Sequence, residues 1–199
     1  MEAMLLPDLT QPVVAVHPDG SFDALPDVRE KAVFPGSFNP LHRGHAELRR
    51  VSEEILGQPV VYEISVSNVA KTDLTTDELR QRLGQFQDCT VVLTNAPTFA
   101  EKSRLLPKSP FVVGFDTAER ILDIRFYNDS EARMLEALTQ FKVEGRRFLV
   151  GGRLVANGID RHFAEIAQLQ IPSGFEELFE GISGEQFRED ISSTQLRGE

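Results

Sequence analysis

The chain has 199 residues, of which 41% are hydrophobic, and it carries a formal net charge of −10. This length suits one domain with its own core, and the negative charge argues against nonspecific binding to nucleic acid or to an anionic membrane surface. The single cysteine, Cys89, cannot form an internal disulfide, so we expect a reducing compartment. The sequence has no apolar stretch that could span a bilayer and no signal peptide, which predicts a cytoplasmic protein.

Residues 1–29 are predicted to form an N-terminal extension that contains a small β-hairpin. An apolar run at residues 12–16 is followed by Pro-Asp-Gly at residues 18–20, which is typical of a turn between two strands. We expect the hairpin to cover one edge of the sheet. Residues 30–199 are predicted to form the main domain.

From residue 31 onward, apolar runs typical of buried strands alternate with helical patterns. This alternation predicts an α/β fold with a parallel sheet covered by helices on both faces. In such a sheet, ligands bind beyond the carboxyl ends of the strands. The predicted strands are residues 31–34, 60–66, 89–93, 111–114 and 148–152, and the predicted helices are residues 43–56, 75–83, 99–105, 116–122 and 129–141.

The pattern weakens after the fifth predicted strand. We expect a turn at residues 156–158 and short helices at residues 160–166 and 173–179. The second of these helices would have a capping box formed by Ser173 and Glu176.

The functional centre is predicted at residues 35–45, where Pro-Gly-Ser-Phe-Asn-Pro-Leu-His-Arg-Gly-His joins a strand to a helix. Gly36 leaves the backbone bare, so a ligand can approach it closely. The helix N-terminus offers free N–H groups and the positive end of a dipole to an anion. His42 and His45 can donate hydrogen bonds to phosphate oxygens, and Gly44 lets a bulky ligand lie against the helix.

Two other interpretations of the histidines stay open at this point. The pair could be half of a metal site, but no Glu lies between them and the only other histidines are His17 and His162. Alternatively, His42 and His45 could be capping or surface residues of an ordinary strand–helix turn.

A second motif lies in the last ten residues. Ser192, Ser193 and Thr194 place three hydroxyls where a helix is expected to begin, and such hydroxyls and free N–H groups can cradle phosphate oxygens. Arg197, one helical turn further on, can reach the same anion with its planar guanidinium. A plain capping box formed by Ser192 and Gln195 fits the spacing equally well.

Together, the two motifs resemble those of the HxGH nucleotidyltransferase superfamily. Gly-Ser-Phe-Asn-Pro at residues 36–40 and His-Arg-Gly-His at residues 42–45 are similar to its signature, and the Phe-Asn-Pro form looks most like the nicotinamide or nicotinate mononucleotide adenylyltransferases. The segment from Ile191 to Arg197 resembles the ISSTxxR motif of the same superfamily. The resemblance covers residues 31–197 and implies a Rossmann-like sheet.

Two further residues acquire roles through this resemblance. Asp116 lies in a segment similar to the Gly-x-Asp segment of the family, whose aspartate lies beside the bound nucleotides, although Asp116 could equally be an N-cap with Glu119 behind it. Lys71 follows the second strand, where the family often has a basic residue that holds the acceptor phosphate. A solvated loop lysine is the alternative for Lys71.

The chain also departs from the pyridine nucleotide enzymes. These usually have a tryptophan after the Gly-x-Asp helix, and this chain has no tryptophan. Residues 94–99 and 114–117 are similar to a cytidylyltransferase-like branch found in bacteria and plants. The identity of the acceptor therefore stays open.

The resemblance implies that a phosphate-bearing acceptor, such as a pyridine mononucleotide, attacks the α-phosphorus of ATP and releases pyrophosphate. Adenylyl transfer is favoured over cytidylyl transfer from CTP. Mg²⁺ would bridge the phosphate oxygens, since the sequence shows no dedicated carboxylate cage for it. The alternatives are a non-catalytic nucleotide-binding or sensing module and a slow nucleoside triphosphate hydrolase. Whether the protein forms a homo-oligomer stays open.

The implied roles divide the site residues into three groups. Backbone N–H groups of Gly36, Ser37 and Phe38 would bind the nucleotide. His42 and His45 would hold the triphosphate and stabilise the charge that develops at its α-phosphate. The β- and γ-phosphates would be held by Ser192, Ser193, Thr194 and Arg197.

Overall fold

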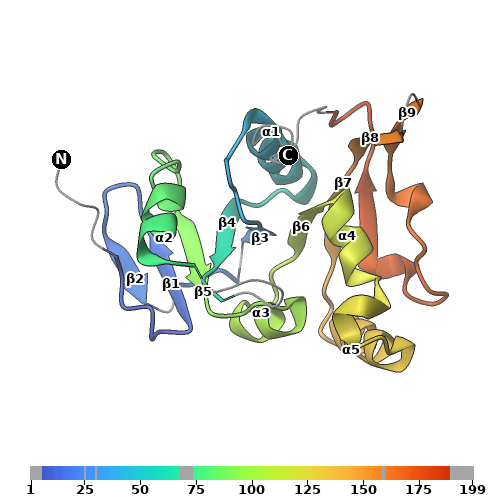
Figure 1. Ribbon diagram of the computed structural model, residues 1–199, viewed down its shortest axis with the longest axis horizontal. Coiled ribbons are helices and arrows are strands. Elements are labelled where there is room, and N and C mark those ends of the chain that lie inside the picture. The colour runs from blue at the N-terminus through green and yellow to red at the C-terminus, as the bar shows by residue number, and fades with distance from the viewer. Residues whose placement is uncertain (1–5, 25, 30, 68–73, 158–159, 189–199) are drawn as a thin grey trace.

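A computed structural model describes residues 6–24, 26–29, 31–67, 74–157 and 160–188, without the side chains of residues 156–161. The main feature is an eight-stranded sheet (Figure 1). The strand order across the sheet is β10 (Phe179–Ile182), β7 (Phe148–Gly151), β6 (Phe111–Gly114), β3 (Ala32–Pro35), β4 (Val60–Ser65), β5 (Val91–Thr94), β1 (Val13–Val16) and β2 (Phe22–Ala24). β1 pairs antiparallel with both β2 and β5, and the other pairs are parallel.

Helices cover both faces of this sheet, as the sequence predicts. The α-helices of the described residues are α1 (Arg43–Leu56), α2 (Thr76–Leu83), α3 (Phe99–Leu105), α4 (Phe115–Ile121) and α5 (Glu131–Val143). α1 and α2 pack on one face, while α3, α4 and α5 pack on the other. Among the described residues, no helix combines the length and the apolar character needed to cross a membrane.

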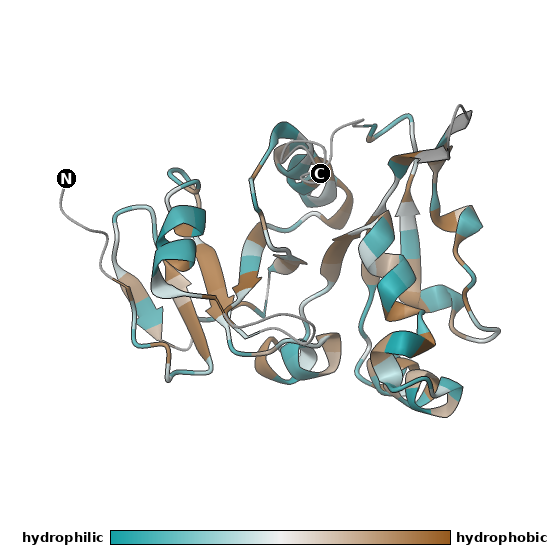
Figure 2. Cartoon of the chain, viewed as in Figure 1, coloured by the Kyte–Doolittle hydropathy of each residue, from teal (hydrophilic) through white to brown (hydrophobic). Residues whose placement is uncertain are grey.

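Each face of the sheet has its own buried apolar cluster. Alternate residues of a strand point to opposite faces, so Phe34 and its neighbour Val33 belong to different clusters. Phe34 joins the cluster that contains Leu48 of α1, and Val33 joins the cluster that contains Leu138 of α5. The central strands, such as β5 and β6, are accordingly strongly hydrophobic, whereas the edge strand β2 is partly hydrophilic (Figure 2). The predicted Rossmann-like α/β fold is therefore confirmed.

The helices on the first face begin and end where their sequences favour it. α1 has the predicted bounds and ends at Gly57, whose φ of 64° suits a glycine C-cap and whose N–H donates to the carbonyl of Glu53 at 3.0 Å. The predicted capping box of α2 is present, since the Glu78 N–H donates to Thr75 Oγ1 at 3.3 Å and the Thr75 N–H donates to Glu78 Oε2 at 2.8 Å.

The N-terminal hairpin, formed by β1 and β2, is continuous with the main sheet. β1 is buried along its whole length, while β2 is exposed and forms the edge. Val13 packs into one core cluster and Val16 into the other. The predicted hairpin at the sheet edge is thus confirmed, and its first strand contributes to both cores.

Two helices predicted near the end of the chain are wrong. Residues 160–166 instead contribute β9 (Asp160–Ala164), which pairs antiparallel with β8 (Arg153–Asn157) in a separate hairpin. Residues 173–179 contain only a short 3₁₀ turn, η3 (Glu176–Leu178), which leads into the edge strand β10. The sequence of β10 only weakly predicts a strand because it contains Gly181. A glycine is needed at this position, since a Cβ would come within 2.5 Å of Ile166 Cγ2.

A buried polar cluster lies between β4, β5 and α3. Glu63 of β4 is fully buried, and its Oε1 binds Nζ of Lys102 at 2.7 Å and accepts from Thr94 Oγ1 at 2.5 Å. The backbone carbonyl of Glu63 also accepts from the N–H of Gly36 at 3.0 Å. The cluster therefore lies directly beside the carboxyl end of β3.

Candidate active site

The topology of the sheet brings the predicted site residues to one edge. β3 lies between β4 and β6, and the chain crosses to opposite sides of β3 in its two halves. This is the switch point at which α/β sheets bind ligands, beyond the carboxyl ends of the strands. The histidine segment follows β3 and Asp116 follows β6, so the topology brings both to this edge (Figure 1).

The turn after β3 is built around a buried phenylalanine. Phe38 has a φ of 44° and is only 1% exposed. A Cβ on Gly36 would lie 2.6 Å from Cζ of Phe38, so only glycine fits where the ring folds back beneath the turn. The N–H of Gly36 donates to the carbonyl of Glu63 at 3.0 Å, so the prediction that this N–H binds the nucleotide is wrong. Ser37 is exposed, while the Phe38 side chain belongs to the core.

Aromatic side chains from β3, β4, α1 and the turn after α2 hold Phe38 in place. Its ring centroid lies 5.4 Å from that of Phe34, 5.0 Å from Tyr62 and 5.6 Å from Phe86, in edge-to-face arrangements. It also lies 5.0 Å from the ring of His45. The core thus reaches directly to one of the two signature histidines.

The two histidines stack at the start of α1. His42 is the N-cap of the helix and His45 is its third residue, and their ring centroids are 3.7 Å apart with an interplanar angle of 25°. The backbone N–H of His42 donates to Nδ1 of His45 at 3.3 Å. The capping interpretation is therefore correct for His42, and it is compatible with a ligand-binding role. Gly44, between the histidines, is buried in the first turn.

His45 is a neutral side chain in this environment. Burial, with a smaller contribution from the neighbouring His42, lowers the pKa of His45 from 6.5 to about 3. A backbone N–H can only donate, so Nδ1 of His45 accepts and carries no proton. The proton of the neutral ring is then on Nε2, which is a hydrogen-bond donor for a ligand.

Asp116 lies in the first turn of α4, with Gly114 as the N-cap. The proposed N-cap role of Asp116 is therefore wrong, because the helix starts one residue earlier than the sequence predicts. The carboxylate of Asp116 forms an ion pair with Arg153, the first residue of β8. Both side chains are partly exposed, with 49% and 38% of their surfaces accessible. Sequence analysis did not identify Arg153, which lies beyond the last strand with a clear pattern.

Residues of α2 and the turn after it also contact the histidine segment. Arg82 donates from Nη1 to the carbonyl of Ser37 at 3.1 Å. Gln85 donates from Nε2 to the carbonyl of Phe38 at 2.9 Å and accepts from the N–H of Leu41 at 2.7 Å. These contacts could not be predicted from the sequence, because a polar side chain that binds the backbone of a distant segment leaves no local pattern.

Several predicted site residues lie outside the described residues. These are Lys71 and the whole second motif, with Ser192, Ser193, Thr194 and Arg197. The chain before the second motif is described as far as Arg188. Phe187 belongs to the same core cluster as Leu48 of α1, so this segment leads past the helix that carries the histidines.

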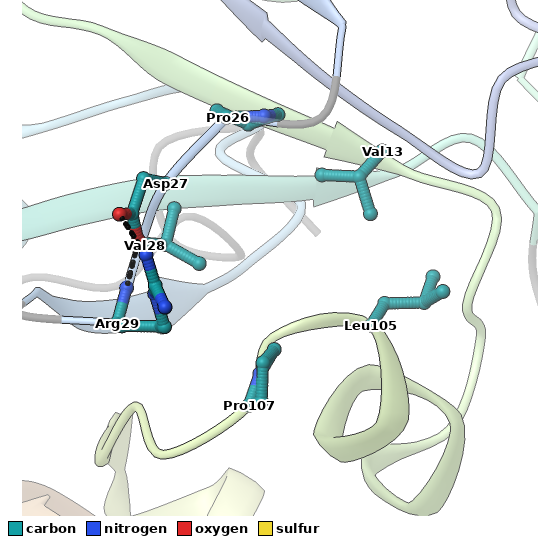
Figure 3. Close-up of a pocket in the computed structure, with 7 residues that line it drawn as sticks. All are labelled: Val13, Pro26, Asp27, Val28, Arg29, Leu105 and Pro107. Atoms are coloured by element: carbon teal, nitrogen blue, oxygen red, sulfur yellow. Dashed lines mark hydrogen bonds and ion pairs between the residues drawn. The ribbon is translucent and has the colours of Figure 1, made fainter.

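A cavity of about 290 Å³ lies elsewhere in the molecule (Figure 3). It is formed by residues that precede β3 and residues around the end of α3, so it shares no residue with the histidine segment that follows β3. The lining is mainly apolar, with one exposed Asp27–Arg29 ion pair at 2.7 Å. The residues that line it are Val13, Pro26, Asp27, Val28, Arg29, Leu105 and Pro107.

The chemistry of the described site suits an anion. Imidazole and backbone N–H donors gather at a helix N-terminus whose first turn has no acidic residue. In the ranges that the structure describes, no three His, Cys, Asp or Glu side chains are grouped as a metal site. The donors present thus fit phosphate groups.

Comparison with known proteins agrees with this geometry. No curated protein matches the chain significantly. A family model described as cytidylyltransferase-like matches residues 33–199, a range that begins in β3 and contains both sequence motifs. The chain therefore belongs to the cytidylyltransferase-like family, within the HxGH nucleotidyltransferase superfamily.

Proposed function

We propose that this protein transfers a nucleotidyl group from a nucleoside triphosphate to a phosphate-bearing acceptor and releases pyrophosphate. The observation that carries the proposal is the stacked pair of His42 and His45 at the N-terminus of α1, beside the switch point of the sheet. Membership of the family supports the reaction class.

The triphosphate is proposed to bind at the start of α1. The positive end of the helix dipole attracts the anion, and Nε2–H of His45 donates to it. The hydrogen bond from Nε2–H of His45 strengthens as the α-phosphate becomes more negative in the transition state. His45 then stabilises the transition state more than the ground state, which is how binding energy lowers a barrier.

The proposed reaction is a direct displacement. An oxygen of the acceptor phosphate attacks the α-phosphorus, and the bond from that phosphorus to the oxygen bridging to the β-phosphate breaks. Pyrophosphate leaves with the electron pair of that bond. The acceptor phosphate is already ionised at neutral pH, so no side chain has to remove a proton. Mg²⁺ bound through the phosphate oxygens would neutralise part of their charge.

The substrates are proposed from the form of the motifs. ATP is the first candidate donor and CTP the second, and a pyridine mononucleotide is the first candidate acceptor because of the Phe-Asn-Pro turn at residues 38–40. The second motif, from Ser192 to Arg197, would hold the β- and γ-phosphates. Lys71 would hold the acceptor phosphate.

Pyrophosphate release tests the proposal. The assay contains Mg²⁺, ATP or CTP, and a panel of phosphorylated acceptors headed by nicotinamide and nicotinate mononucleotides. Release that depends on an acceptor supports nucleotidyl transfer, and the productive acceptor names the substrate. Nucleotide binding without release would indicate a sensing module, and nucleoside monophosphate without an adduct would indicate hydrolysis.

The variant His45→Ala tests the role of the imidazole. We expect kcat to fall by about 100- to 1,000-fold, the typical effect of removing one preorganised donor, with a much smaller change in nucleotide affinity. The matched control is His162→Ala, which removes an exposed histidine of the β8–β9 hairpin. Turnover of His45→Ala at the wild-type rate would contradict the assigned role.

A further inference from the structure

The segment between β3 and α1 lies outside the strands and helices. Residues 36–42 leave the sheet after the Gly36 N–H bond to Glu63 and join the helix only at its N-cap. The side chains of Arg82 and Gln85, on α2 and in the turn that follows it, bind this segment from outside. The position of the histidines therefore depends on contacts from a different part of the chain.

Gln85 binds the segment at two points. Its Oε1 accepts from the N–H of Leu41 at 2.7 Å, directly before His42. Its Nε2 donates to the carbonyl of Phe38 at 2.9 Å and to that of Arg82 at 3.2 Å. One amide thus bridges both ends of the residues 38–41 turn and fastens it to α2.

Arg82 adds a third point of attachment. Its guanidinium donates to the carbonyl of Ser37 at 3.1 Å, so the start of the segment is also held by α2. The side chain is partly buried, and burial lowers the pKa of Arg82 below its ordinary value.

α2 is a firm support for these contacts. Leu79 and Leu83 are 1% and 3% exposed and pack in the same cluster as Phe38. Phe86, next to Gln85, also contacts the Phe38 ring edge to face. The polar and apolar contacts of this region therefore fix the same turn from two directions.

We propose that Gln85 and Arg82 are positioning residues of the active site, which hold residues 37–41 so that the His42 and His45 imidazoles face the α-phosphate. The proposal rests on the proposed function for its kinetic consequence. A small displacement of a catalytic group can cost about 100-fold in rate, so contacts outside the site can control turnover.

The test compares Gln85→Ala, Gln85→Glu, Arg82→Ala and Arg82→Lys in the pyrophosphate release assay. Gln85→Ala is expected to lower kcat by about 10- to 100-fold, with a much smaller change in the KM for the nucleotide. Gln85→Glu retains the acceptor for Leu41 but loses the donor to Phe38, so an intermediate rate is expected. Arg82→Lys should recover part of the activity that Arg82→Ala loses.

Two comparisons separate positioning from loss of folding. The control Gln81→Ala changes an exposed glutamine on the same helix and should leave both kcat and the thermal midpoint unchanged. In a His45→Ala background, Gln85→Ala should have little further effect, because groups that act as one unit are not additive. A wild-type kcat in Gln85→Ala, or a full additional loss on top of His45→Ala, would overturn the proposal.

A spectroscopic readout keeps the two proposals distinguishable. Imidazole ¹H–¹⁵N resonances of His42 and His45 should shift in Gln85→Ala and Gln85→Glu but not in Gln81→Ala. If wild-type protein releases no pyrophosphate with any acceptor, the proposed function fails while these shifts still support the positioning role. Unchanged histidine resonances in both Gln85 variants would overturn the positioning role.

Discussion

His45 shows how one residue can be set for its task by its surroundings. The ring is neutral because it is buried and stacked on His42, and its tautomer follows from the backbone N–H bound to Nδ1. The proton on Nε2 makes this nitrogen a donor to an anion without any change in the charge of the ring. We therefore expect the resonance of Nε2–H of His45 to shift when nucleotide binds, while the ring stays neutral.

The lowered pKa of His45 predicts a pH dependence of folding. Between pH 6.5 and about 3, the unfolded protein binds a proton at His45 that the folded protein does not. Stability therefore increases as pH rises through this window and is lost as pH falls through it. The variant His45→Gln does not titrate there, and its amide can still accept from the N-cap N–H. Measured by urea unfolding, the free energy of unfolding should fall less steeply with decreasing pH in the variant than in the wild type. Parallel pH profiles would contradict the assigned pKa shift.

Gly36 is predicted to tolerate no side chain. In Gly36→Ala, the new Cβ would lie 2.6 Å from Cζ of Phe38, a ring that its aromatic neighbours prevent from moving. We expect overpacking to destabilise the protein by about 1–3 kcal/mol and to shift the turn. Thermal unfolding and nucleotide calorimetry measure both effects. A variant with wild-type stability and affinity would show that the turn can adjust.

Sequence patterns could identify some of these residues and not others. The histidines and Gly36 were predictable, because a strand end, a glycine turn and a helix start lie next to one another in the chain. The sequence did not predict the roles of Arg82, Gln85 and Arg153, because each of them contacts a residue that is distant in the sequence. The local sequence around these residues predicts only the exposed face of a helix or the end of a strand.

At the scale of elements, prediction succeeded where a local signal and the tertiary structure agree. Long apolar runs gave the central strands, and α1, α3 and β6 have the predicted bounds. Prediction failed after β7. There, the segments β8, β9 and β10 form strands because they pair with other strands, and their own sequences do not indicate this. A strand such as Phe-Glu-Gly-Ile in β10 has weak intrinsic preference and is fixed by pairing with β7.

The buried ion pair between Glu63 of β4 and Lys102 of α3 is predicted to affect the free energy of unfolding far more than exposed ion pairs do. Lys102→Met leaves the carboxylate of Glu63 buried without its cation, which typically costs about 3–5 kcal/mol. Urea unfolding measures this loss. The control Arg50→Ala breaks exposed pairs with Glu47 and Glu54 on α1 and should change stability much less. Equal losses in the two variants would contradict the prediction.

At the scale of the whole molecule, the N-terminal hairpin is predicted to be part of the folded unit. Removing residues 1–29 would strip β1 from β5 and remove Val13 and Val16 from the two cores. The exposed edge of β5 would also invite pairing with other chains. We therefore expect the shortened protein to unfold at a lower temperature and to aggregate, as calorimetry and light scattering can measure. A shortened protein that is monomeric and equally stable would show that the hairpin is a separate addition.

The place of β1 in the sheet also has a consequence for synthesis. β1 is made early, yet its partner β5 comes from well beyond β3, α1 and β4 in the chain. Until Thr94 has left the ribosome, the apolar segment Val-Val-Ala-Val cannot form its pairing with β5. A nascent chain paused before that point therefore exposes the edge of β1 that β5 will cover, and translation speed through β5 affects how long that edge can pair with other chains.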